Sequence, residues 1–216
     1  MIDVVSFSKA GGHAINEDAL GISQHPSDAD CWLCCLADGQ GGQAGGGRAA
    51  QVACAAGIAA AVRYCPERLM QGSTWTSILR QADQAVSVDP DAGYTTLIGL
   101  CICKGIIAGA SCGDSAALVA CGSSQPKALT LGQAKNPPVG SAAAPFASFQ
   151  DGLVTPWTVV VMSDGVWKYV GWEGVVQAVL QERGQRLLET LQSRARLTGS
   201  GRFQDDFTLV AFEDVG

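Results

Sequence analysis

The chain has 216 residues, a length that suits one sizeable domain with its own hydrophobic core. Its 14 basic and 20 acidic residues give a net charge of −6, and the sequence contains no lysine- and arginine-rich stripe, which argues against a nucleic-acid partner. No apolar stretch reaches the roughly 20 residues of a membrane helix, and Met1–Val5 does not resemble the start of a secretion signal. We therefore expect a cytoplasmic protein without a membrane span.

The hydrophobic pattern predicts strands and helices in separate groups. The expected strands cover residues 2–8, 19–23, 31–37, 94–103, 106–112, 115–121, 155–162 and 207–213. The expected helices cover residues 48–64, 73–87, 171–182 and 184–197. Strands in runs and helices in pairs favour an α+β fold over a strict alternation of the two.

Residues 132–152 interrupt this pattern because they are rich in glycine, proline, alanine and serine. This composition predicts a mobile loop, and a linker between two domains is the alternative. An apolar strand resumes over 155–162, and acidic patches on both sides of the segment are expected to act together. We therefore expect one domain over residues 1–216.

Four short acidic patches lie at or just beyond the ends of predicted strands. They are Asn16-Glu17-Asp18, Ala37-Asp38-Gly39, Ser163-Asp164-Gly165 and Gln204-Asp205-Asp206. Carboxylates brought together repel one another unless cations lie between them, and ligands that are all oxygen select hard cations such as Mg²⁺, Mn²⁺ or Ca²⁺. Each patch alone could be a turn or a solvated loop, but the four together predict a metal site with a catalytic role.

The nine cysteines admit two interpretations. Cys31-x-x-Cys34-Cys35 resembles half of a zinc site, but the sequence has no second CxxC at a matching spacing and its only histidines are His13 and His25. Alternate residues of a strand face opposite ways, so Cys34 and Cys35 would point to different faces. We expect buried free thiols that pack as small apolar side chains, with zinc or redox roles as the alternative.

Six motifs in order resemble those of the protein phosphatase 2C family, the metal-dependent serine/threonine phosphatases, in its bacterial form. The matching segments are Asn16-Glu17-Asp18-Ala19, Ala37-Asp38-Gly39-Gln40-Gly41-Gly42, Thr95-Thr96-Leu97, Gly113-Asp114-Ser115, Ser163-Asp164-Gly165-Val166-Trp167 and Asp205-Asp206-Phe207-Thr208. The resemblance implies a four-layer αββα sandwich, in which two antiparallel sheets lie face to face with helices outside.

The resemblance also implies a site that holds two Mg²⁺ or Mn²⁺ ions. Asp38 would bridge the ions, with Asp164 and Asp205 on one, and Glu17 and the Gly39 carbonyl on the other, while Asp18 would hold a metal-bound water. The implied reaction is hydrolysis of phosphoserine or phosphothreonine on a partner protein by an activated hydroxide, without a phosphoenzyme. The enzyme would oppose a cognate serine/threonine kinase.

The chain departs from the family pattern at several positions. His13 stands where the family usually has a phosphate-binding arginine, so we expect either a weaker, pH-dependent phosphate contact or an exposed histidine with Lys9 or Arg48 supplying the charge. Gln40 cannot protonate a leaving group. Lys168 replaces an aspartate that would share a third metal with Asp114, so that site is expected to be lost or altered.

The segment between Asp114 and Asp164 is also short for the family's flap subdomain, which implies a more open site. Two other functions therefore stay open at this point. One is a non-catalytic module of the same fold that binds phosphoproteins. The other is a phosphatase that acts on small molecules.

Overall fold

Two antiparallel sheets, each of five strands, organise the chain. The computed structural model describes residues 1–12, 14–41, 44–122 and 124–216. They divide into a first unit (Met1–Asn16, Ala116–Leu129 and Val154–Gly216) and a second unit (Glu17–Ser115 and Thr130–Leu153), each with one sheet. The chain passes between the units after Asn16, Ser115, Leu129 and Leu153, so neither unit is a continuous segment.

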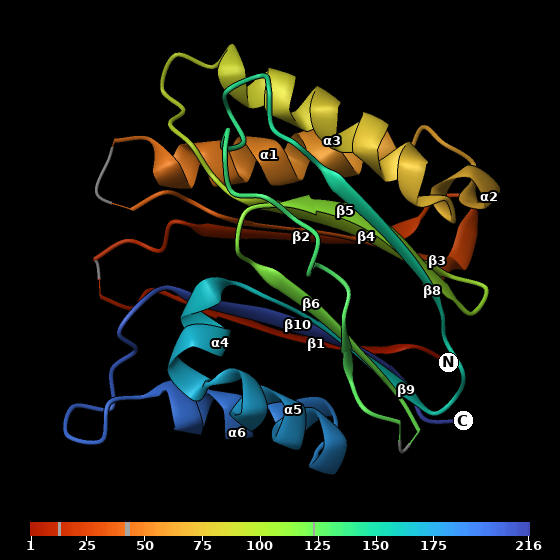
Figure 1. Ribbon diagram of the computed structural model, residues 1–216, viewed down its shortest axis with the longest axis vertical. Helices are drawn as coiled ribbons and strands as arrows, with labels where there is room; N and C mark the ends of the chain where they lie inside the picture. The colour runs from red at the N-terminus through yellow and green to blue at the C-terminus, as the bar shows by residue number, and fades with distance from the viewer. Residues whose placement is uncertain (13, 42–43, 123) are drawn as a thin grey trace. The chain divides into compact units, whose positions relative to one another are not determined.

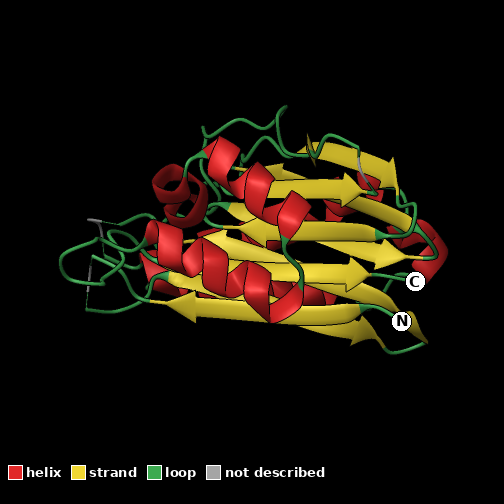
Figure 2. Cartoon of the chain, turned by 90° about the horizontal axis from the view of Figure 1, so that it is seen from below, coloured by secondary structure: helices red, strands yellow, loops and turns green. Residues whose placement is uncertain are grey.

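The sheet of the first unit pairs the beginning of the sequence with a much later part. Its strand order is β1 (Asp3–Lys9), β10 (Phe207–Asp214), β9 (Trp157–Met162), β6 (Ala116–Cys121) and β7 (Lys127–Ala128). Three helices, α4 (Asp164–Val170), α5 (Trp172–Gln181) and α6 (Gly184–Ala195), gather at one face of this sheet (Figure 1). Figure 2 shows helices lying in front of the strands of a sheet. The core between them combines aliphatic side chains such as Val160, Leu187 and Leu209 with the stacked rings of Phe203 and Phe207.

The sheet of the second unit has the strand order β2 (Asp18–His25), β3 (Asp28–Asp38), β4 (Leu97–Cys103), β5 (Ile106–Cys112) and β8 (Ala147–Gly152). Two long helices, α1 (Gly46–Ala61) and α3 (Gly72–Ser87), lie side by side over one face, with the short α2 (Pro66–Leu69) between them in sequence (Figure 1). Strands β4 and β5 are almost entirely buried, and so is the apolar part of β3 over residues 33–37, as these apolar sequences predict.

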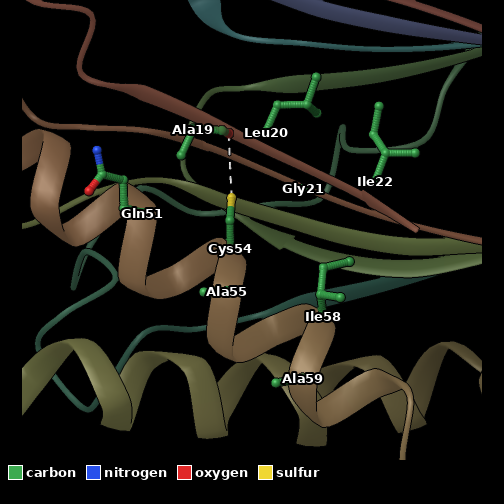
Figure 3. Close-up of a pocket in the computed structure, with 9 residues that line it drawn as sticks. All are labelled: Ala19, Leu20, Gly21, Ile22, Gln51, Cys54, Ala55, Ile58 and Ala59. Carbon is green, nitrogen blue, oxygen red and sulfur yellow. Dashed lines mark hydrogen bonds between the residues drawn. The ribbon is translucent and has the colours of Figure 1, made fainter.

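A groove of about 440 Å³ lies between β2 and α1 (Figure 3). It is lined by Ala19, Leu20, Gly21, Ile22, Gln51, Cys54, Ala55, Ile58 and Ala59. Small residues on both elements let α1 approach the strands closely, and the Cys54 thiol donates a hydrogen bond to the carbonyl of Ala19 over 3.4 Å. The lining contains no carboxylate, and it begins at Ala19, the residue that follows Asp18 of an acidic patch.

The predicted α+β class, with two antiparallel sheets flanked by helices, is confirmed. Every predicted strand and helix has a counterpart, although β2 and β3 are longer than expected. The first predicted helix ends earlier, at Ala61, because Pro66 opens the separate turn α2 as its first helical residue, where proline is well tolerated. A single domain over residues 1–216 stays a prediction. No helix among the described residues is both long and apolar enough to cross a membrane.

Residues 132–152 differ from the predicted mobile loop. Residues 147–152 form β8, which pairs with β5 at the edge of the sheet. The preceding residues are fixed to α3 by Asp83, which is 2% exposed. Its carboxylate accepts hydrogen bonds from the main-chain N–H groups of Gly140, Ala142 and Ala144, at 2.6, 3.2 and 3.0 Å. A buried carboxylate with three donors anchors this segment to the second unit.

We expect Asp83→Ala to lower the free energy of unfolding by about 3 kcal/mol, because it leaves three main-chain donors without their charged acceptor. Chemical denaturation measures the loss, and limited proteolysis should cut residues 132–146 of the variant first. Asp83→Asn keeps one acceptor oxygen and should lose less. A loss below about 1 kcal/mol in Asp83→Ala would show that other contacts hold the segment.

All nine cysteines are free thiols. Seven are buried, as expected, whereas Cys65 is exposed and Cys121 is half-buried, so the prediction of burial is wrong for Cys65. Cys65 directly precedes α2 in a surface turn, where no sheet covers it. Burial raises the pKa of the Cys35 thiol to about 12 and that of Cys34 well above its ordinary value. The described residues contain no group of three or more His, Cys, Asp or Glu side chains placed to hold a metal ion, so the zinc interpretation gains no support.

Iodoacetamide at pH 8 should therefore modify Cys65 of the native protein, because thiols such as Cys34 and Cys35 are both inaccessible and protonated there. Mass spectrometry of the digested protein locates the label. Cys65→Ser is the matched control and should reduce labelling of the folded protein to the slow reaction of Cys121. Rapid labelling of Cys34 or Cys35 under native conditions would contradict this expectation.

Candidate metal centre

In the second unit, one end of the sheet gathers the acidic residues of two motifs. Asp18 begins β2, Asp38 ends β3, and the two are partners in the antiparallel register. The N–H of Gly39 donates a hydrogen bond to the Glu17 carbonyl over 3.2 Å. Glu17, Asp18, Asp38 and Gly39 therefore lie together, and the three carboxylate residues are partly exposed.

Two threonines fix the main chain of Asp38. The Asp38 N–H donates to Thr96 Oγ1 over 3.0 Å, and the Thr96 N–H donates to the Asp38 carbonyl over 2.9 Å. Thr95 Oγ1 donates to the same carbonyl over 2.8 Å, and Ser115 Oγ lies 2.8 Å from Thr96 Oγ1. None of these contacts uses the Asp38 carboxylate. They explain why two successive threonines and a serine accompany the acidic motif.

The first turn of α1 packs against the same end of the sheet. A Cβ atom at Gly39 would lie 2.5 Å from the main-chain carbon of Gly46, and one at Gly47 would lie 3.4 Å from the Glu17 Cα. The helix N-terminus therefore stands beside Glu17 and Gly39. Its partial positive charge favours carboxylates at this position.

In the first unit, two further acidic residues lie at one end of neighbouring strands. Asp164 directly follows β9 as the first residue of α4, and Asp205 lies just before β10. Ser163 joins the two strands, since its N–H donates to the Thr208 carbonyl over 2.9 Å and its Oγ accepts from the Thr208 N–H over 3.1 Å. The buried Ser163 thus fixes Asp164 relative to Asp205.

The main chain at Asp205 and Asp206 packs tightly against two glycines. A Cβ atom at Gly11 would lie 1.7 Å from the Asp205 carbonyl oxygen, and one at Gly165 would lie 2.0 Å from that of Asp206. The Gly11 N–H also donates to Asp206 Oδ1 over 2.9 Å. Only residues without a side chain allow this approach, so the Gly11 and Gly165 positions determine where Asp205 lies.

The donor groups fit Mg²⁺ or Mn²⁺. Carboxylates and a main-chain carbonyl are hard oxygen donors of the kind that these ions prefer, and Glu17, Asp38, Asp164 and Asp205 are all partly exposed. Among the described residues, no three carboxylates stand together in a group placed to hold an ion. The structure brings together Glu17, Asp18, Asp38 and Gly39 within the second unit, and in the first unit Gly165, next to Asp164, lies close to Asp205.

The sequence model of the protein phosphatase 2C family matches residues 8–199. The chain belongs to the protein phosphatase 2C family. The family recognised from the six motifs is thereby confirmed, and with it the predicted class of enzyme, a protein serine/threonine phosphatase. None of the curated proteins compared is similar enough to match the chain.

Solved structures of bacterial phosphatases share the fold. The serine/threonine phosphatase Stp1 from Staphylococcus aureus has 17% identity and a TM-score of 0.76, with 100% of this chain and 96% of that chain covered. RsbX in complex with magnesium has 14% identity and a TM-score of 0.75, with 98% and 94% covered. The catalytic domain of the phosphatase PstP in complex with two manganese ions has 20% identity and a TM-score of 0.74, with 100% and 99% covered.

Two acidic residues of this protein phosphatase 2C member carry lysine partners. Lys168 Nζ forms an ion pair with the Asp164 carboxylate four residues earlier in α4. Lys135 Nζ lies 2.6 Å from Asp114 Oδ2. These pairs were not predicted from the sequence. The spacing of four between Asp164 and Lys168 would have indicated the first pair if α4 had been expected as a helix, whereas Lys135 lies 21 positions from Asp114 and gives no local signal.

The cations considered for substrate phosphate have different surroundings. Arg48 is bound to Asp89, with Nη2 and Nε at 2.8 and 3.0 Å from the same carboxylate oxygen. Lys9 is exposed at the end of β1, two residues before Gly11. His13 lies outside the described residues. Gln40 donates its main-chain N–H to the Tyr94 carbonyl over 2.9 Å, and its side chain is exposed.

We expect Gly11→Ala to displace the Asp205 main chain, because a methyl group 1.7 Å from a carbonyl oxygen cannot be accommodated. The free energy of unfolding should fall by about 1–3 kcal/mol, and Mn²⁺ should bind more weakly. Gly199→Ala is the matched control in the same unit, since no heavy atom lies within 4 Å of a Cβ atom there. Thermal denaturation with and without MnCl₂ checks both effects, and equal behaviour of the two variants would refute the role of Gly11.

Proposed function

We propose that this phosphatase hydrolyses phosphoserine and phosphothreonine on protein substrates with two Mg²⁺ or Mn²⁺ ions. Glu17, Asp38 and the Gly39 carbonyl of the second unit and Asp164 and Asp205 of the first would hold the ions, with Asp38 shared between them. The proposal treats residues 1–216 as one catalytic domain. Two solved relatives support the choice of ions, RsbX with magnesium and PstP with two manganese ions.

One observation carries the proposal. Asp38 and Asp205 are held through their main chains, by Thr95 and Thr96 in one unit and by close contact with Gly11 in the other. Both residues lie at strand ends and are partly exposed, so their side chains stand at defined positions that solvent can reach. Oxygen donors on a rigidly positioned main chain suit a metal ligand.

The ions and the side chains around them would have separate roles in the reaction. When bound, the ions supply Lewis acidity, which lowers the pKa of a water molecule toward neutrality and offsets charge on the phosphoryl group. Asp18 would accept a hydrogen bond from the attacking water and orient it. The side-chain amide of Gln40 is not acidic enough to protonate the leaving group. The leaving oxygen would therefore take its proton from solvent water. Lys9 or His13 would contact the substrate phosphate.

We propose two ions and no third ion at Asp114. The ammonium of Lys135, 2.6 Å away, already balances the charge of this carboxylate. The aspartate that the family pattern places at position 168 as the other ligand of a third ion is also missing, because this chain has a lysine there. A cognate kinase and a cytoplasmic location stay predictions.

We expect Asp38→Asn to abolish both Mn²⁺ binding and turnover, because it removes the shared ligand charge. The assay is hydrolysis of p-nitrophenyl phosphate and of a phosphothreonine peptide across a Mn²⁺ titration. Asp28→Asn, at the other end of the same strand, is the matched control and should keep wild-type activity. Unchanged turnover in Asp38→Asn would overturn the mechanism.

The same titration separates the other two functions. Wild-type protein that binds Mn²⁺ and phosphopeptide without turnover would indicate a non-catalytic binding module. Faster hydrolysis of sugar phosphates or nucleotides than of the phosphopeptide would indicate a phosphatase of small molecules.

A further inference from the structure

Lys168 bears directly on one of the proposed metal ligands. Its ammonium forms an ion pair with the Asp164 carboxylate, one turn earlier in α4. The Asp164 side chain is 14% exposed, so its charge is poorly screened by water, whereas that of Lys168 is 41% exposed. Both residues belong to one short helix. The pair is therefore a local feature of α4.

An ammonium group and a divalent ion compete for the same carboxylate. Both are cations, so they repel each other at the few ångströms that would separate them on one acidic group. A lysine side chain has a flexible stem and can move its charge without moving the main chain. In this same position the Lys168 Nζ also lies 5.8 Å from the centre of the Trp167 ring, within range of a cation–π interaction, and the side chain is 41% exposed, so it can turn toward solvent.

We propose that Lys168 is an internal competitor for the metal ion at Asp164. In the metal-free protein it balances the charge of Asp164, and it leaves this carboxylate toward solvent when an ion binds. Lys168 thereby lowers the affinity of the site for the ion. A higher concentration of the metal ion is then needed to fill the site. This inference rests on the proposed function, since it takes Asp164 to be a metal ligand.

The test is calorimetric titration of MnCl₂ into the metal-free protein, without substrate. Lys168→Met removes the ammonium and keeps the length of the side chain. Lys104→Met is the matched control, because Lys104 pairs with Glu67 over 2.9 Å on the surface and Glu67 is not a proposed ligand. Both variants lower the net charge by one, so general attraction of cations changes equally in both. Circular dichroism establishes that each variant is folded.

We expect Lys168→Met to bind Mn²⁺ about three- to tenfold more tightly than wild type, in the range that a partly exposed ion pair contributes. Lys104→Met should stay within about twofold of wild type. Lys168→Arg retains a cation and a stronger carboxylate contact, so it should bind Mn²⁺ no more tightly than wild type. A merely structural contribution of Lys168 to α4 would not produce this order.

Three results would overturn the inference. Equal affinities of Lys168→Met and Lys104→Met would show that only net charge matters, and weaker binding by Lys168→Met would show that Lys168 orients Asp164 for the ion. Asp38→Asn separates this failure from failure of the proposed function. If Mn²⁺ binding is lost in Asp38→Asn but unchanged in Lys168→Met, the metal centre stands and the role of Lys168 falls. If no variant binds Mn²⁺, both fall.

Discussion

Mutual repulsion between carboxylates is the constraint on which the rest of this site depends. Acidic residues that are to share ions repel one another, so other contacts must fix their positions. Main-chain contacts supply much of this. Thr95 and Thr96 hold Asp38, Gly11 and Gly165 pack against residues 205–206, and Ser163 joins the strands on which Asp164 and Asp205 depend. Charge contributes as well, since Lys168 pairs with Asp164. The surrounding motif residues thus largely position the main chain of the proposed metal ligands.

Much of the fold could be read from the sequence because the sheets consist of long apolar runs. The buried strands β3, β4, β5 and β9 have continuous hydrophobic sequences, and their positions were predicted closely. The elements that were missed are short or weakly patterned. Strand β8 has the sequence Ala-Ser-Phe-Gln-Asp-Gly, with alternate residues exposed. It forms because its main chain pairs with that of β5 at the edge of the sheet. Helix α4 was not predicted, because it has only seven residues and a glycine at its second position, which weakens the helical signal.

The sequence predicts the acidic residues of the proposed site but little of what holds them in place. Motif order along the chain was enough to propose Glu17, Asp38, Asp164 and Asp205 as ligands. Their supports come from distant parts of the sequence. Gly11 meets Asp205 across nearly the whole chain, and Asp83 fixes a loop some 57 to 61 residues away. Such contacts have no periodicity and no neighbouring signal, so only the folded structure could reveal them.

The pairing of β1 with β10 has a consequence for the timing of synthesis. Residues 3–9 leave the ribosome long before residues 207–214, yet each is the other's partner in the sheet. The first strand therefore stays unpaired while nearly 200 further residues are synthesised. Asp205 is synthesised just before the partner strand. Contacts of such long range form slowly. A chain synthesised only as far as residue 204 would lack both the β1–β10 pairing and a proposed metal ligand, so the proposed activity would require that residues 205–214 have been made.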